Sequence, residues 1–280
     1  MTAAGSVRVV VLAENHAVGD DLVAEHGLAL WVEADGRRFF LDTGAGRALV
    51  PNACTLGVPL AGADAVILSH GHFDHTGGLT ALAKVAGVFR LYMHPEAAWP
   101  RFSRHGAGPG RPIGMPVDAA ALVETLGDRV VPVTGPVRLT ERIGITGSIP
   151  RRTDYEDTGG PFYLDAEGTA VDDLPDDQAV WVATDRGLVV LLGCAHAGVV
   201  NTLMYVTALA GADRIRAVVG GMHLVNADEE RLDRTMAALR EHAVEIIAPC
   251  HCTGIAAVDR IAWEFPGEFI RAASGLVLEL

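Results

Sequence analysis

The chain has 280 residues, half of them hydrophobic, and a formal net charge of −13 at pH 7. Its length suits one large domain or two small ones, and its apolar content allows a large buried core. The acidic excess argues against nucleic acids and anionic membranes as partners, because their negative charge repels such a surface. No apolar stretch approaches the ~20 residues that span a bilayer, and residues 1–6 do not resemble a signal peptide, so we expect a cytoplasmic protein.

The cysteine content argues against a disulfide scaffold. Cys54, Cys194, Cys250 and Cys252 are too few to staple a chain of this length. Cys250 and Cys252 are also too close in sequence to pair readily with each other. We therefore expect reduced thiols.

Apolar runs bounded by turn residues predict one half of a sandwich between residues 7 and 95. The two runs around Asp35-Gly36 predict a β-hairpin, since this dipeptide favours a tight turn. The predicted elements are strands at 7–12, 28–34 and 38–41, a helix at 47–56, a strand at 63–68, a helix at 79–85 and a strand at 88–93.

The pattern of apolar runs that predicts helices and strands is weak between about residues 96 and 175. Glycine and proline are dense from 106 to 116, and arginines occur there and again at Arg151 and Arg152. Only a short helix at 118–125 and an apolar run at 143–149 are indicated. Long irregular segments in compact domains act as lids or binding loops, so we expect such an insert within a single domain, 1–280. Arg151 and Arg152 are candidates for substrate binding, with a solvated surface loop as the alternative.

The second half regains a clear pattern. Asn226 followed by Glu229 resembles a capping box that opens an amphipathic helix. The predicted elements are a hairpin of strands at 179–183 and 188–192, a helix at 199–209, a strand at 215–219, the helix after Asn226, a strand at 245–248 and an edge strand at 276–280.

A loop rich in ligand-type side chains follows the predicted strand at 63–68. His70, His72, Asp74 and His75 occur within six residues. Imidazole nitrogens and carboxylate oxygens suit zinc and similar divalent metals. In an extended chain His70 and His72 project to one face, while Asp74 and His75 lie beyond the bend and reach a second position. The spacing favours a metal site over a polar surface loop.

Four predicted strands end in a histidine, namely His70, His196, His223 and His251. Because open α/β layers place their sites at the carboxyl ends of strands, we expect these residues to converge. Three protein ligands per metal leave an open position, which is typical of a catalytic site. The predicted ligands are His70, His72 and His196 for one metal and Asp74, His75 and His251 for a second.

Other residues near these strand ends leave alternatives open. His223 could act as an acid, a base or a substrate contact, or have a structural role. In an extended chain Cys250 and Cys252 face away from His251, which favours packed thiols over zinc ligands. Cys194 lies two residues before His196, so both side chains could point the same way.

The spacing H-x-H-x-D-H resembles the metal-binding loop of the metallo-β-lactamase superfamily. This resemblance implies an α/β (α+β) fold, a four-layer αββα sandwich with one or two divalent metal ions between its sheets. Zinc is the first expectation, with iron or manganese as alternatives. In this superfamily an Asp-x-Gly such as Asp42-Thr43-Gly44 commonly supports the metal loop from behind. By its chemistry alone, Asp42 could equally cap the turn.

A closer resemblance extends over nearly the whole chain. It is to the branch typified by the archaeal dihydropterin–ribofuranosylaminobenzene 5′-phosphate synthases, many members of which are described only as metal-dependent hydrolases. The matching motifs are Glu25-His26-Gly27-Leu28, Leu41-Asp42-Thr43-Gly44, the metal loop, Gly147-Ser148-Ile149-Pro150-Arg151, Asp176-Asp177-Gln178-Ala179, Gly193-Cys194-Ala195-His196-Ala197-Gly198, Gly220-Gly221-Met222-His223-Leu224 and Pro249-Cys250-His251-Cys252-Thr253-Gly254.

Two positions depart from the superfamily's usual pattern. Two-metal members usually carry a bridging aspartate in a Gly-Asp pair, whereas this chain has Gly193-Cys194. Either Cys194 takes that bridging place or no protein group bridges. His72 stands where the di-iron redox branch usually has a glutamate, which argues against electron-transfer chemistry.

The resemblance predicts a metal-dependent hydrolase that acts on a small, phosphorylated or otherwise anionic substrate through a metal-bound hydroxide. Asp74 and His223 are the candidate catalytic groups. One alternative is a transferase that joins a pterin methyl diphosphate to a ribofuranosylaminobenzene phosphate. Others are a metal-loaded binding module and a nuclease, the last of which the net charge of −13 disfavours.

Overall fold

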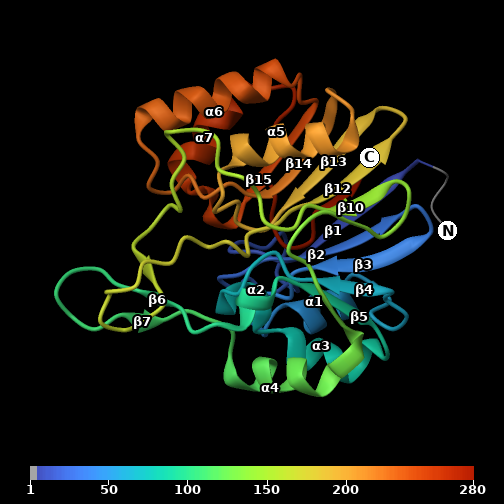
Figure 1. Cartoon of the computed structure of the whole chain (residues 1–280). Coiled ribbons are helices and arrows are strands. Elements are labelled where there is room, and N and C mark those ends of the chain that lie inside the picture. The colour runs from blue at the N-terminus through green and yellow to red at the C-terminus, as the bar shows by residue number, and fades with distance from the viewer. Residues whose placement is uncertain (1–4) are drawn as a thin grey trace.

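Two β-sheets pack face to face, with helices on the outer face of each, in the computed structural model, which describes residues 5–280 (Figure 1). This is the four-layer αββα arrangement that the resemblance to the metallo-β-lactamase superfamily implies. No helix within residues 5–280 is both long and apolar enough to span a membrane.

The first sheet has seven strands. Their spatial order is β16 (Val277–Glu279), β1 (Val7–Ala13), β2 (Ala29–Ala34), β3 (Arg37–Leu41), β4 (Ala65–Ile67), β5 (Arg90–Met93) and β8 (Val130–Pro132). The predicted hairpin joins β2 to β3, and Asp35 and Gly36 take the positive φ values of 48° and 72° that a tight turn of this kind requires. From β3 onward the strands are parallel, so the loops after β3 and β4 leave the sheet at the same edge.

The second sheet has six strands, and its parallel half carries three of the predicted histidines. The order is β15 (Ile246–Cys250), β14 (Ile215–Gly221), β13 (Gly187–Leu192), β12 (Val180–Thr184), β10 (Ile143–Ile145) and β9 (Val137–Arg138). Strands β13, β14 and β15 are parallel neighbours. Their carboxyl ends therefore bring His196, His223 and His251 to one edge.

Alternating side chains of the strands fill three apolar layers. In β1, Val9 and Val11 belong to the core between the sheets, whereas Val10 and Leu12 face the helices. Helices α1 (Leu49–Thr55), α3 (Leu79–Ala86) and α4 (Val117–Leu126) cover the first sheet. Helices α5 (Val199–Ala210), α6 (Glu229–Glu241) and α7 (Ile255–Glu264) cover the second. Four single turns, α2 (Phe73–Thr76), η1 (Pro95–Ala98), η2 (Gly127–Arg129) and η3 (His251–Thr253), lie in the loops.

The segment at about 96–175 is only partly an insert. Strand β8 completes the first sheet, and β9 and β10 belong to the second. The part that stands apart is a small sheet of β6 (Phe102–Ser103), β7 (Arg111–Pro112) and β11 (Phe162–Tyr163), which projects from the sandwich beside the site (Figure 1).

One predicted cap is wrong. Helix α6 begins after Asp228, whose side chain accepts a hydrogen bond from the backbone N–H of Arg231. Asn226, the predicted cap, instead donates from Nδ2 to the carbonyl oxygen of Gly159 at 3.3 Å. A tertiary partner thus takes the side chain that the local pattern assigned to the helix.

A strap formed by residues 176–178 holds the loop that follows β4. Asp176 Oδ2 accepts a hydrogen bond from the backbone N–H of Gly71 at 2.8 Å. Gln178 donates from Nε2 to the Leu68 carbonyl at 2.7 Å, and from its backbone N–H to the Ser69 carbonyl at 2.9 Å. Because buried polar groups without partners are costly, these bonds fix the path of the loop.

The strap is also tied to the second sheet and to the projecting segment. Asp177 Oδ2 accepts a hydrogen bond from the backbone N–H of Ala197 at 2.8 Å. The buried Arg101 forms ion pairs with Asp172 at 2.5 Å and with Asp176 at 2.8 Å. Burial raises the pKa of Asp176 to about 6, although Arg101 opposes that shift. At neutral pH the buried guanidinium therefore has a carboxylate on each side.

Replacing Asp176 with alanine should lower the free energy of unfolding by about 3 kcal/mol, because Arg101 then loses one of its two buried carboxylates. Urea denaturation of the metal-free protein measures this change. Asp173→Ala, at an exposed neighbouring position, is the control and should change the value by less than about 0.5 kcal/mol. An Asp176→Ala variant as stable as the wild type would contradict this role of the strap.

Candidate metal centre

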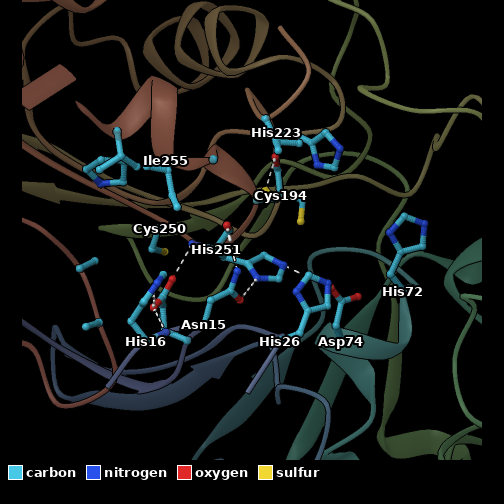
Figure 2. Close-up of a pocket in the computed structure, with 18 of the residues that line it drawn as sticks. Asn15, His16, His26, His72, Asp74, Cys194, His223, Cys250, His251 and Ile255 are labelled. Atoms are coloured by element: carbon cyan, nitrogen blue, oxygen red, sulfur yellow. Dashed lines mark hydrogen bonds and ion pairs between the residues drawn. The ribbon is translucent and has the colours of Figure 1, made fainter. Parts of the chain in front are cut away.

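Loops from both sheets bring the predicted ligands to one place. The loop after β4 carries His70 and His72, and the loops after β13 and β15 carry His196 and His251. They meet at a pocket with a volume of about 680 Å³. Figure 2 shows His26, Asp74 and His251 side by side at this pocket, with Cys194 and His223 beyond them.

The first group consists of His70, His72 and His196. The ring centroids of His70 lie 4.5 Å from His72 and 4.8 Å from His196, and those of His72 and His196 lie 5.0 Å apart. His70 Nε2 is 3.0 Å from His72 Nδ1. The Nε2 atoms of His72 and His196 are buried and have no hydrogen-bond partner within residues 5–280.

The second group consists of Asp74, His75 and His251. The Nε2 atoms of His75 and His251 face each other at 3.2 Å, and Asp74 Oδ2 lies 3.3 Å from His251 Nε2. In both groups at least one pair of donor atoms therefore lies 3.0–3.3 Å apart. The donor atoms of His70 and His196, like those of His75 and His251, lie within 4.8 Å of each other.

Hydrogen bonds on the outer side of the rings orient two of these histidines. His196 Nδ1 lies 2.8 Å from the Thr158 carbonyl oxygen, and His251 Nδ1 lies 2.9 Å from Asn15 Oδ1. Both oxygens are acceptors, so each Nδ1 carries the proton and donates it. The Nε2 lone pairs of His196 and His251 are consequently directed into the site.

Asp42 orients two more, His70 and His75. Ser69 Oγ donates to Asp42 Oδ2 at 2.6 Å, and His75 Nδ1 donates to the same oxygen at 2.7 Å. With its proton committed to Asp42, Ser69 Oγ accepts from His70 Nδ1 at 2.9 Å. His70 and His75 thus also turn their Nε2 atoms into the site, an arrangement common among metal-binding histidines.

The charge preferences of the two groups differ. Burial lowers the pKa of His72 to about 3 and holds that of His196 well below its ordinary value, so these rings stay neutral. Burial also lowers the pKa of His75, but the carboxylates of Asp42 and Asp74 outweigh it and raise that pKa to about 9. The second group therefore stabilises positive charge. Neutral imidazoles beside a carboxylate-rich position fit one or two divalent cations.

Cys194 lies between the two groups. Its Sγ is 3.1 Å from His75 Nε2. It forms one set of ligand-type atoms within 4.8 Å of one another with His70 and His196, and another such set with His75 and His251. The thiol thus occupies the place from which a bridging group would reach both positions.

His26 is a site residue that the sequence analysis did not single out. Its Nε2 lies 3.1 Å from Asp74 Oδ2, and its side chain is 64% exposed. The hydrogen bond with Asp74 raises the pKa of His26. The only sequence signal was its place in a motif of the family branch, since no local spacing links it to Asp74.

The structure does not bring Arg151 and Arg152 to the pocket. Both side chains are exposed, and Arg151 Nη2 donates to the Asp173 carbonyl oxygen at 2.9 Å. The arginines that line the pocket are Arg111 and Arg271. The charged loop at 150–157 instead packs against α5, where Asn201 Oδ1 accepts hydrogen bonds from the backbone N–H groups of Arg152 and Thr153. Strand β7 carries Arg111 to the pocket.

The backbone at 251–253 is not extended as we expected. His251 has a φ of +52°, and the chain turns into η3. Cys250 packs in the core between the sheets as predicted, but Cys252 turns towards Cys194 and donates from Sγ to its carbonyl oxygen at 3.6 Å. The alternation argument therefore fails for Cys252.

Unusual backbone conformations concentrate at these loops. Within residues 5–280, seven non-glycine residues have clearly positive φ values, and four of them lie at the site. These four are Asp42 at 61°, Ala195 at 54°, His223 at 43° and His251 at 52°. Such conformations cost free energy and persist where the surrounding structure enforces them, as at functional sites.

Comparison with known proteins finds relatives that match nearly the whole chain. A synthase of Methanocaldococcus jannaschii named 7,8-dihydropterin-6-methyl-4-(beta-D-ribofuranosyl)-aminobenzene-5'-phosphate synthase is 29% identical, over 98% of this chain and 97% of that protein. The crystal structure of Tm1679, a metal-dependent hydrolase of the beta-lactamase superfamily, superposes with a TM-score of 0.82 at 28% identity over 98% and 99% of the two chains.

A more distant structure shares the fold alone. Zinc-bound PqqB from Methylobacterium extorquens has a TM-score of 0.54 at 14% identity, over 98% of this chain and all of that one. The family model described as the metallo-beta-lactamase superfamily matches residues 23–213. On fold, loop geometry and this match together, the chain belongs to the metallo-beta-lactamase superfamily.

Proposed function

We propose that this enzyme is a metal-dependent hydrolase acting on a small, phosphorylated or otherwise anionic substrate. The observation that carries this proposal is the convergence of the Asp74 carboxylate and the Nε2 atoms of four histidines beside one pocket. These histidines are His70, His75, His196 and His251. Superfamily members typically bind divalent metal ions. An anionic group at the pocket would complete the coordination of such ions.

The two groups of donors would hold two ions, with zinc as the first candidate and iron or manganese as alternatives. His70, His72 and His196 would hold one, and Asp74, His75 and His251 the other. Such ions would lower the pKa of bound water from about 15.7 towards about 7 and polarise a phosphoryl or carbonyl oxygen. Cys194, whose Sγ lies within 4.8 Å of donor atoms from both groups, would adjoin both.

Side chains of the pocket would accept the proton released by the attacking water and supply one to the leaving group. Burial raises the pKa of Asp74, but His75 and His251 outweigh it and hold that pKa well below its ordinary value, so the carboxylate is an acceptor. His26 lies 3.1 Å from Asp74 Oδ2 and is largely exposed, so it would pass a proton from Asp74 to solvent. His223, whose ring centroid is 4.2 Å from that of His196, would donate to the leaving group or contact the substrate.

The pocket suits a substrate that has an apolar body and an anionic end. Phe73, Ile113 and Phe162 form apolar walls, and Arg111 and Arg271 supply positive charge. A pocket of about 680 Å³ suits a small molecule rather than a nucleic acid. The four cysteines are free, which accords with the proposed cytoplasmic location.

A second candidate function is the transferase reaction. It is favoured by the relative that is 29% identical over 98% of this chain and is named as a synthase. In this reaction the nitrogen of an arylamine would bond to the methylene carbon of a pterin methyl diphosphate, and diphosphate would leave with the electron pair. Asp74 would take the amine proton, and the flat apolar walls would accommodate an aromatic reactant.

Replacing His70 and His72 together with alanine should remove one metal ion and reduce turnover by at least about a hundredfold, since even outer partners of ligands contribute about ten- to a hundredfold. Elemental analysis and initial rates measure these effects. His242→Ala, at the end of α6, is the matched control. A folded, metal-free double variant with wild-type turnover would refute the proposal.

The metal-loaded enzyme should hydrolyse at least one of two probes, a generic phosphodiester or a lactone, and chromatography with mass spectrometry measures the products. Incubation with a pterin methyl diphosphate and an arylamine phosphate tests the second candidate. Release of diphosphate together with a coupled product would favour the transferase, whereas hydrolysis without coupling would favour the hydrolase.

Replacing Arg111 with alanine should raise the KM for an anionic substrate about tenfold, which corresponds to about 1.4 kcal/mol of lost binding, and should leave kcat nearly unchanged. Steady-state kinetics measure both constants. Arg151→Ala provides the control, because that side chain does not line the pocket. A larger effect of Arg151→Ala than of Arg111→Ala would overturn this assignment.

A further inference from the structure

We propose that Cys194, His223 and Cys252 form a third site in the pocket wall, next to the two groups above, for a soft divalent cation such as Zn²⁺ or Cd²⁺. One ligand atom from each of these residues lies within 4.8 Å of the other two. All three residues line the pocket, so an ion can reach them from solvent. This site does not depend on the proposed reaction.

Three neighbouring parallel strands build the site. Cys194 follows β13, His223 follows β14 and Cys252 lies in η3, directly after β15. His223 itself has a φ of +43°, and His251, the residue before Cys252, has a φ of +52°. These two turns direct the His223 imidazole and the Cys252 thiol towards Cys194. If the backbone stayed extended, both side chains would point past Cys194.

Two glycines leave the space that these side chains occupy. A Cβ atom on Gly221 would lie 2.6 Å from Cys252 Sγ, and one on Gly159 would lie 2.0 Å from His223 Cδ2. Gly159 also has a φ of +84°, which other residues rarely adopt. The arrangement is therefore built into the backbone on both sides.

The local hydrogen bonds leave donor atoms available. His223 Nδ1 is buried and has no hydrogen-bond partner in the part of the chain that the structure describes. Cys252 Sγ makes a long contact of 3.6 Å with the Cys194 carbonyl oxygen, and both thiols are free of disulfides. An imidazole nitrogen and two sulfurs are thus within reach of one ion.

The donor chemistry distinguishes this site from its neighbours. The two groups described above offer nitrogen and carboxylate oxygen, whereas this one offers two sulfurs and one nitrogen. Thiolates select soft cations over hard ones. Cys194 is shared, since its Sγ also lies 3.1 Å from His75 Nε2, so the new site adjoins the proposed catalytic metals.

The test is a titration of reduced, metal-free protein, as the full 280-residue chain, with Cd²⁺ alone. The ultraviolet absorbance of the cadmium–thiolate charge-transfer band measures the binding. In the wild type, the absorbance of this band per Cd²⁺ bound at the site should correspond to two thiolate ligands. Cys252→Ser should reduce it to that of one and weaken Cd²⁺ binding at this band by at least about tenfold, because it removes a direct ligand. Cys54→Ser, at an exposed thiol on α1, should change neither.

Two results would overturn the proposal. One is a charge-transfer band in the wild type whose absorbance corresponds to one thiolate ligand or to none. This result is obtained on the unmodified protein, so it does not depend on whether a variant folds. The other is an unchanged band in folded Cys252→Ser or Cys252→Ala, which would mean that Cys194 alone binds the ion. The His70→Ala/His72→Ala variant should retain the band, and this separates failure of the proposed function from failure of this site.

Discussion

The candidate metal centre depends on the hydrogen bonds that the buried carboxylate of Asp42 accepts. This carboxylate accepts hydrogen bonds from the Ser69 backbone N–H at 2.7 Å, from Ser69 Oγ at 2.6 Å and from His75 Nδ1 at 2.7 Å. Through Ser69 it also sets the tautomer of His70. One charge thus fixes the loop, orients two rings and favours a cation beside them. The positive φ of Asp42 is consistent with a backbone shaped for this purpose.

The arrangement of the two sheets brings these local contacts together at one accessible site. Parallel strands in both sheets end at the same edge, and the strap at 176–178 links the loop after β4 to the loop after β13. Similarity to a full-length synthase and to a metal-dependent hydrolase supports an enzyme, either hydrolase or transferase. Under the proposed function, the imidazoles and Asp74 would serve both chemistries, and the apolar walls and arginines of the pocket would distinguish the substrates.

Much of the fold could be predicted because its signals are local. The hairpin at Asp35-Gly36 and most strands follow from turn residues and apolar runs. Helix α7 was not predicted, although its buried residues Ala257, Val258 and Ile261 have helical spacing. The short strand β8 gave too weak a pattern to identify. The cap of α6 was misassigned because Asn226 bonds to Gly159, a partner 67 positions away.

The sequence by itself determined the kinds of ligand and their places at strand ends, because both follow from residue identity and short-range periodicity. The tertiary structure alone decided which nitrogen of each ring faces inward, since that depends on partners such as Thr158 and Asn15 from distant segments. It also decided that Arg111 rather than Arg151 reaches the pocket, and that Cys252 turns towards Cys194. Contacts between residues far apart in the chain set these orientations, and no local pattern records them.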